Sequence, residues 1–212
     1  APTGLTGVIW PNGEIRTMKA CEAVGIPYCL STVSISSLED IADVASNPFW
    51  FQLYVIRDRD FIERLIQRAE AVGIETLVVT LDLQMVGQRN KDIHNGLSSP
   101  PKPTITNLLD IIRHSAWRYE MLRFRNVRFG NLQGHVKDLG DGKSLSEWTN
   151  EQFDPSLNWR DVKRLRDRWK GKLILKGILA PEDAQTACEI GADAIVVSNH
   201  GGRQLDGAPA TI

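Results

Sequence analysis

The chain has 212 residues, of which 42% are hydrophobic, and this is enough to form one sizeable core. Its 25 basic and 26 acidic side chains give a formal net charge of −1, which argues against a dedicated nucleic-acid binder. No run of 18 apolar residues occurs, so we expect no membrane-spanning helix, and three scattered cysteines, Cys21, Cys29 and Cys188, favour reduced thiols in a cytosolic-type compartment.

Short apolar segments alternate with amphipathic ones along the chain. The first helical pattern covers residues 12–25 and is followed by β-rich runs at 26–32 and 49–55. A second helix is predicted over 58–73, with Gly73 as its C-terminal cap, and leads into a strand at 76–83. Later come a strand at 172–178, a helix at 181–192 and a strand at 192–199. The strands are apolar at successive positions, which is typical of a parallel α/β fold covered on both faces.

The spacing of strand ends fits two α/β folds. Ser31, Gln52 and Thr80 are about 21 to 28 residues apart, which suits an eight-stranded TIM barrel or a doubly wound sheet. Polar residues end several different strands, as expected when ligands are collected around one barrel mouth: Thr3, Ser31, Gln52, Tyr54, Thr80, Lys176, Ser198 and His200. We therefore predict a TIM barrel.

One long insertion interrupts this alternation. Residues 84–158 separate the strands at 76–83 and 172–178, far beyond the usual connection length. Within it, residues 108–129 are partly amphipathic, and residues 113–128 carry five arginines against the single acid Glu120. The insertion is either a solvated active-site lid or a membrane-surface or partner-docking segment, anchored by Trp117, Tyr119, Leu122 and Phe124.

Several common motifs are excluded. The sequence "LGDGKS" at 139–144 resembles the end of a phosphate-binding P-loop, but Lys137 replaces the required first glycine and no strand precedes it. No GxGxxG occurs, so a nicotinamide site has no support. The spacings of His94, His114 and His135 build no metal site, and we expect none.

The segment "VVSNHGGRQLDG" at 196–207 concentrates polar chemistry where a strand ends. His200 is either a structural histidine or a base, and Gly201 and Gly202 permit positive φ and close approach of a ligand. Arg203 can hold a carboxylate through two parallel hydrogen bonds. Together these residues suggest proton removal next to a carboxylate.

Three other charged residues have two interpretations each. Lys176 is a residue of the barrel rim, or a cation that neutralises an anionic ring or forms a Schiff base. Asp82 caps a loop or orients an imidazole. Arg89 is a surface charge or a second contact to a carboxylate.

These motifs resemble a known family. "SNHGGRQLDG", together with "APTG", "WFQLYV", "TLD" and "KGI", is similar to the FMN-dependent L-2-hydroxy-acid dehydrogenases and oxidases. Among them, "STVS", "FDPS" and "GADAIVVSNHGGRQLDG" most resemble the bacterial respiratory L-lactate dehydrogenases. The resemblance covers essentially the whole chain and implies a single FMN-binding TIM-barrel domain over residues 1–212. It also implies that this is a portion of the barrel, without the family's N-terminal segment and last strands.

The resemblance assigns a role to each matching residue. The cofactor FMN would be bound by Pro2, Thr3, Gly4, Ser31, Gln52, Thr80, Lys176 and Ser198. The substrate would be held by Tyr54, Arg89, His200 and Arg203. His200 would be the catalytic base, Asp82 would orient it, and Tyr54 and Arg203 would complete the catalytic set.

The implied reaction is oxidation of an L-2-hydroxy acid, most simply L-lactate, with electrons passing to FMN and then to quinone or a cytochrome. Alternatives are an oxidase that reduces oxygen to hydrogen peroxide, a mandelate dehydrogenase, and a barrel fragment that serves only as a binding module. The resemblance further implies a homo-oligomer, a tetramer in the family. We expect a cytoplasmic protein, in peripheral contact with the inner membrane through residues 108–129.

Overall fold

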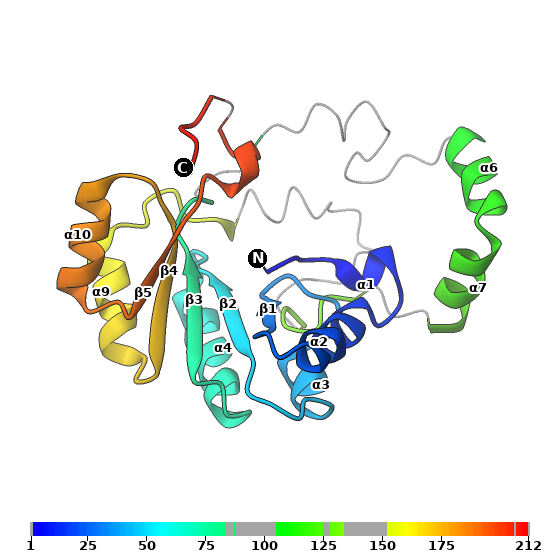
Figure 1. Cartoon of the computed structure of the whole chain (residues 1–212), viewed down its shortest axis with the longest axis horizontal. Coiled ribbons are helices and arrows are strands. Elements are labelled where there is room, and N and C mark those ends of the chain that lie inside the picture. Colours follow the sequence, from blue (N-terminus) through cyan, green and yellow to red (C-terminus); the bar gives the residue numbers. More distant parts are fainter. Residues whose placement is uncertain are drawn as a thin grey trace. The chain divides into compact units, whose positions relative to one another are not determined.

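The computed structural model describes residues 2–83, 87, 105–124, 128–133, 152–205 and 207–211 (Figure 1). The chain divides into two compact units, and each is described by itself. The first unit comprises Ala1–Ser46 and Arg89–Trp148, and the second comprises Asn47–Gln88 and Thr149–Ile212.

The second unit is built on four parallel strands. β2 (Trp50–Tyr54), β3 (Thr76–Thr80), β4 (Lys172–Ile178) and β5 (Ala194–Val197) pair in that order. The register aligns Tyr54 with Thr80 and Thr80 with Lys176, so these side chains lie at one level near the carboxyl ends of their strands. Every residue of β3 is buried, as predicted from its unbroken apolar run.

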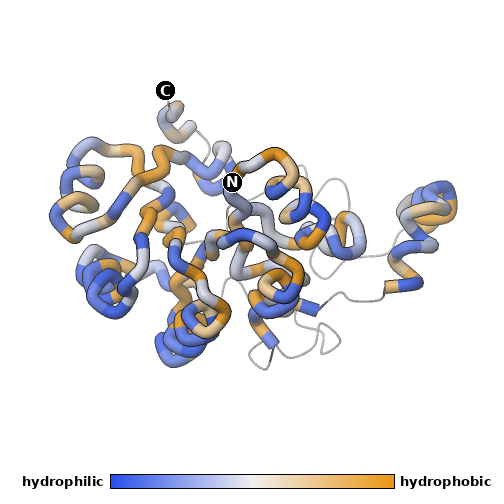
Figure 2. The backbone as a smooth tube through the Cα atoms, turned by 60° about the horizontal axis from the view of Figure 1, so that its bottom comes forward, coloured by the Kyte–Doolittle hydropathy of each residue, from blue (hydrophilic) through white to orange (hydrophobic). Residues whose placement is uncertain are grey.

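Helices α4 (Arg59–Ala71), α9 (Trp159–Arg168) and α10 (Pro181–Ile190) alternate with these strands. The Asp58 side chain caps α4 by accepting from the backbone of Phe61 at 2.9 Å. In α10, Pro181 starts the helix, and Gly191 ends it at φ 89°, the left-handed region that favours glycine. Burial on one side only gives the helices the alternating hydrophilic and hydrophobic stretches that are visible in Figure 2.

The first unit contains α1 (Thr6–Ile9), α2 (Gly13–Ala23), β1 (Cys29–Ser31), α3 (Leu38–Ala42), α6 (Ile105–Arg113) and α7 (Ser115–Phe124). Glu14 is fully buried and accepts from the backbone N–H groups of Gly7 and Ile35, each at 3.0 Å. Asn131, also buried, accepts from the Leu38 N–H at 2.8 Å. These two buried side chains connect segments of the first unit through hydrogen bonds to backbone N–H groups.

Four of the described strands are shorter than the sequence predicted, while β4 has the predicted bounds. The strand expected at 76–83 ends at Thr80, the last residue of β3 that pairs with β4, so Asp82 follows the strand. The strand expected at 192–199 is Ala194–Val197, and that at 26–32 is Cys29–Ser31. Residues 108–129 contain parts of two helices, α6 and α7, separated at His114.

Candidate functional site

The carboxyl ends of β2 and β3 present two buried polar side chains. Gln52, on β2, donates from Nε2 to Thr80 Oγ1, on β3, at 3.0 Å. Gln52 is fully buried and Thr80 nearly so. A buried amide and hydroxyl bonded to each other form a preorganised polar edge beside the strand ends.

Next to this pair, the buried ammonium group of Lys176 contacts the carboxylate of Asp82. Lys176 Nζ, from β4, lies 3.4 Å from Asp82 Oδ2 and 3.2 Å from Ser198 Oγ. The exposed fractions of the Lys176 and Asp82 side chains are 9% and 11%. A charge this enclosed requires a partner, and Asp82 supplies the opposite charge.

The same carboxylate also holds the imidazole of His200. Asp82 Oδ1 lies 2.7 Å from His200 Nδ1, and the His200 side chain is 17% exposed. An ionised carboxylate only accepts, so Nδ1 carries the hydrogen and Nε2 of the neutral ring keeps its lone pair. The structure therefore brings His200 and Asp82 together in the arrangement the sequence predicted for an oriented base.

The backbone around His200 is bent to allow this contact. His200 has φ 59°, and Gly201 and Gly202 follow at 67° and 68°. Asn199 accepts from the Gly201 N–H at 3.0 Å, and Ser198 Oγ accepts from the His200 N–H at 3.1 Å. A non-glycine residue in the left-handed region is uncommon and clusters at functional sites.

Asp82 is held in its ionised form. Burial acts to raise the pKa of Asp82, but the hydrogen bond from His200 and the charge of Lys176 outweigh it, so the pKa lies below its ordinary value. The carboxylate is thus negative at neutral pH, as its role beside two basic groups requires.

Gly177 is a site residue that sequence reasoning missed. It lies in a register shift between β4 and β5, and its φ is 107°. A Cβ at this position would lie 2.7 Å from Asp82 Cβ and 2.8 Å from its backbone nitrogen. Only glycine leaves room for Asp82 here. The glycine in "KGI" was the available signal.

Arg203 is exposed and directly follows the short 3-10 turn His200–Gly202. Its carbonyl oxygen would lie 2.1 Å from a Cβ added to Gly87, so the chain at Gly87 passes directly against this loop. Arg89, the second predicted carboxylate contact, lies outside the described residues, as do His94 and His135. Tyr54 is half-buried at the end of β2.

The remaining predicted residues belong to the first unit. Pro2, Thr3 and Gly4 precede α1, and the next N–H, that of Leu5, bonds to the Val33 carbonyl at 3.0 Å. A Cβ on Gly4 would lie 2.5 Å from Val33 Cγ2 and 3.6 Å from Ser31 Oγ. The structure therefore brings Gly4 close to Ser31 at the end of β1.

The described residues offer neither a metal site nor a membrane-spanning helix. Within the ranges that the structure covers, no three His, Cys, Asp or Glu side chains gather in a way that could hold a metal ion. No helix within those ranges has the length and apolar character needed to cross a bilayer.

Known proteins match this chain over nearly its whole length. The family model described as FMN-dependent dehydrogenase matches residues 1–212. A protein named L-lactate dehydrogenase from Caulobacter vibrioides is 44% identical over 208 residues, which are 98% of this chain and 54% of that protein. The chain thus spans about half the length of the curated relatives it matches.

Solved structures agree. The monotopic membrane protein (S)-mandelate dehydrogenase matches with a TM-score of 0.87 and 37% identity, over 99% of this chain and 56% of that one. A mandelate oxidase matches with a TM-score of 0.74 and 33% identity, over 100% of this chain and 51% of that one. These matches confirm the predicted TIM-barrel fold, to which the described helices and strands belong.

Proposed function

The chain belongs to the FMN-dependent dehydrogenase family, which matches it from residue 1 to 212, and on that basis we propose that it oxidises an L-2-hydroxy acid to the 2-oxo acid with bound FMN. The contact of His200 with Asp82, beside the buried Lys176, is the observation that carries this proposal. L-Lactate is the substrate we favour, because a 44% identical relative bears the name L-lactate dehydrogenase.

The described residues fit a flavin. The Lys176 ammonium has three hydrogens, and the described residues offer it two acceptors at 3.2 and 3.4 Å, so it retains capacity for an electron-rich ring edge. Gln52 and Thr80 place an amide and a hydroxyl beside it, suited to the polar edge of an isoalloxazine ring. Ser198 completes this group, and Pro2, Thr3, Gly4 and Ser31 are the residues we assign to FMN in the first unit.

The chemistry that FMN supplies is acceptance of two electrons. His200 Nε2 takes one proton from the substrate, and Asp82 stabilises the imidazolium that results. Arg203, and with it Arg89, holds the substrate carboxylate, while Tyr54 donates to a substrate oxygen. The substrate would leave as the 2-oxo acid after losing two electrons and two protons, one proton to His200 and the other, with the electrons, to FMN.

A substrate panel tests the proposal. The purified full-length protein should be yellow and should bleach anaerobically with an L-2-hydroxy acid, fastest with L-lactate among L-lactate, (S)-mandelate and glycolate, and not with D-lactate. His200→Asn should slow flavin reduction by about 10²–10⁴-fold, the usual contribution of a positioned base. Retention of the flavin without bleaching by any member of the panel would contradict the proposed reaction.

The carboxylate clamp has its own test. Arg203→Met should raise the dissociation constant of the hydroxy acid and slow flavin reduction. A matched control is Arg160→Met, another exposed arginine of the second unit, which lies in the first turn of α9. Equal substrate affinity in the two variants would argue against Arg203 as the clamp.

The electron acceptor of the reduced enzyme is proposed to be quinone or a cytochrome. Stopped-flow reoxidation distinguishes this from an oxidase, because an oxidase would recover its yellow colour rapidly in air. We also propose a homo-oligomer, and light scattering on the holoenzyme measures the state directly.

Peripheral membrane contact through residues 108–129 is the second part of the proposal. Helix α6 exposes an apolar stripe at i, i+3, i+4 and i+7, formed by Ile105, Leu108, Leu109 and Ile112. On α7, Tyr119 and Leu122 are exposed beside Arg118 and Arg123. Exposed apolar side chains with arginines suit the surface of an anionic bilayer. A solved relative described as a monotopic membrane protein supports this.

Sedimentation with vesicles tests the membrane contact. The full-length protein should bind vesicles that contain anionic phosphatidylglycerol and release as salt rises, since surface charges are then screened. Leu108→Asp with Leu109→Asp should weaken binding, while flavin reduction stays unchanged. Equal binding to neutral and anionic vesicles would remove the electrostatic part of the proposal.

A further inference from the structure

Residues 152–154 return to the end of β2 from far along the chain. Phe153 forms an antiparallel bridge with Ile56. The Arg57 N–H donates to the Gln152 carbonyl at 2.9 Å, and Arg57 Nε donates to the Phe153 carbonyl at 3.1 Å. Arg57 therefore holds the two backbone carbonyls that flank Phe153 against the residues that follow Tyr54.

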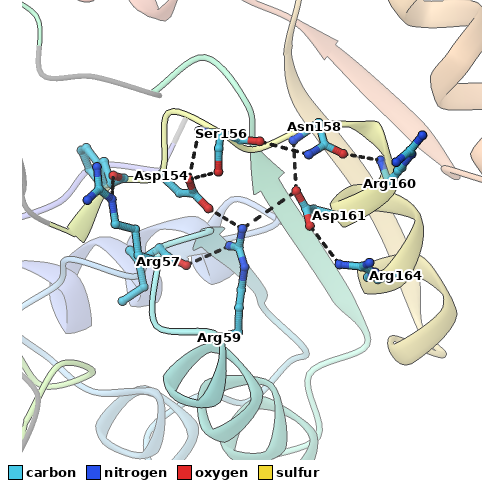
Figure 3. A network of polar contacts seen from close by, with 10 residues as sticks. Arg57, Arg59, Asp154, Ser156, Asn158, Arg160, Asp161 and Arg164 are labelled. Atoms are coloured by element: carbon cyan, nitrogen blue, oxygen red, sulfur yellow. Dashed lines mark hydrogen bonds and ion pairs between the residues drawn. The ribbon is translucent and has the colours of Figure 1, made fainter.

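A second arginine, Arg59, binds Asp154, the residue after Phe153. Arg59 forms an ion pair with Asp154 and donates from Nη1 to the Ile56 carbonyl at 2.8 Å (Figure 3). Asp154 also accepts from the Ser156 N–H and hydroxyl, at 2.9 and 2.6 Å. Burial acts to raise the pKa of Asp154, but the Ser156 hydrogen bonds and the Arg59 charge lower it, so the carboxylate remains ionised. Both arginines thus hold residues 152–156 against the β2–α4 connection.

This arrangement presses one aromatic ring against another. The Phe153 and Tyr54 ring centroids are 5.6 Å apart, and the rings are tilted by 53°. Phe153 is only 4% exposed, so its ring is enclosed and cannot move freely. Tilted rings at this separation attract each other beyond simple area burial. The Phe153 ring therefore restricts the orientations open to the Tyr54 ring.

We propose that Phe153 is a positioning residue, which sets the direction of the Tyr54 hydroxyl toward the substrate, and that Arg57, Arg59 and Asp154 hold it in place. The inference rests on the proposed function, in which Tyr54 donates to the hydroxy acid. A misplacement of about 1 Å at such a group can cost about 100-fold in rate. Phe153 thus acts on the reaction only through the Tyr54 hydroxyl.

A double-mutant cycle on the full-length holoenzyme tests this. Phe153→Leu should weaken L-lactate binding, or slow flavin reduction, by about five- to tenfold when Tyr54 is present. In the Tyr54→Phe background the same change should have less than a twofold effect, because the hydroxyl it positions is gone. A full-sized effect in both backgrounds overturns the proposal.

Phe61→Leu is the matched control. Phe61 is 5% exposed on α4, close to the burial of Phe153, so its replacement removes a similarly buried ring. It should lower thermal stability comparably and leave substrate affinity unchanged. If Phe153→Leu does not fold, Asp154→Asn loosens the same contact and should show the same dependence on Tyr54.

A spectroscopic readout is independent of turnover. The ¹⁹F signal of Tyr54 in fluorotyrosine-labelled protein can be assigned by its loss in Tyr54→Phe. Phe153→Leu should shift and narrow that signal as the ring gains freedom, and an unchanged signal contradicts the restraint. If the unmodified protein fails to reduce its flavin with any hydroxy acid, the proposed function fails. If it turns over but shows no coupling between the two rings, only this inference fails.

Discussion

Replacing Asp82 with asparagine removes the negative charge of the side chain and keeps its shape. The carboxylate lies 2.7 Å from His200 Nδ1 and 3.4 Å from Lys176 Nζ. An asparagine can turn its amide N–H toward Nδ1, which places the imidazole hydrogen on Nε2 and removes the lone pair that accepts the substrate proton. In a serine protease the equivalent change lowers kcat by about 10⁴. We expect Asp82→Asn to slow flavin reduction by about 10³–10⁴-fold.

The same substitution should lower stability. At 3.4 Å and an effective dielectric constant of about 20, the attraction between Asp82 and Lys176 is about 5 kcal/mol, part of which offsets their lost hydration. Removing one partner of a buried pair costs roughly 3–5 kcal/mol. Because asparagine retains some hydrogen bonding, we expect the free energy of unfolding to fall by about 3 kcal/mol, at the lower end of that range.

Acid should abolish the difference in the free energy of unfolding between Asp82→Asn and the unmodified protein. The folded-state pKa of Asp82 is lowered, so its stabilising contribution is present above the unfolded-state value, about pH 4, and is lost as the pH falls through the folded-state value. Urea unfolding of both proteins between pH 3 and pH 7 measures this. Asp167→Asn, at an exposed carboxylate on α9, is the control. Two results would contradict these expectations. One is a difference in the free energy of unfolding between Asp82→Asn and the unmodified protein that stays constant with pH. The other is a rate of flavin reduction that falls less than tenfold in Asp82→Asn with full flavin occupancy.

Three further substitutions test the surrounding structure. Gly177→Ala should destabilise the protein by at least about 2 kcal/mol in urea unfolding, because it combines a positive φ with a clash against Asp82. Leu65→Ala, in the fully buried face of α4, should cost about 3 kcal/mol in the same assay. Arg168→Met breaks partly exposed ion pairs with two glutamates of α4, so thermal melting should show a loss below about 1 kcal/mol that shrinks further in salt.

Elements with local signals were predicted well. The strand at 172–178 has the predicted bounds, and α10 begins at Pro181 as predicted and ends at Ile190, two residues before the predicted end. Helix α4 ends two residues before Gly73, which adopts φ 78°. Each of these boundaries is set by proline, glycine or a run of apolar residues acting within a few positions. Such signals can be read from the chain directly.

Features that depend on distant contacts were not predictable. The pairing of Tyr54 with Phe153 joins residues on two separate stretches of the chain, and nothing in either segment specifies the other. Strand β5 was expected to be covered on both faces, yet Ala194, Val196 and Val197 are exposed in the described structure. Asp82 was placed on a strand, but the pairing of β3 with β4 ends at Thr80, two residues before it.

The charges at the site explain why these three side chains are held together. With His200 neutral, Lys176 and Asp82 cancel, and the cluster carries no net charge. When His200 accepts a proton, the cluster becomes positive while remaining largely enclosed, so it attracts negative charge that develops nearby. In the proposed reaction, the carboxylate that Lys176 and His200 share would thus link proton transfer to His200 with stabilisation of negative charge nearby. Gly177 makes this sharing possible, because any side chain there would push Asp82 away from both partners.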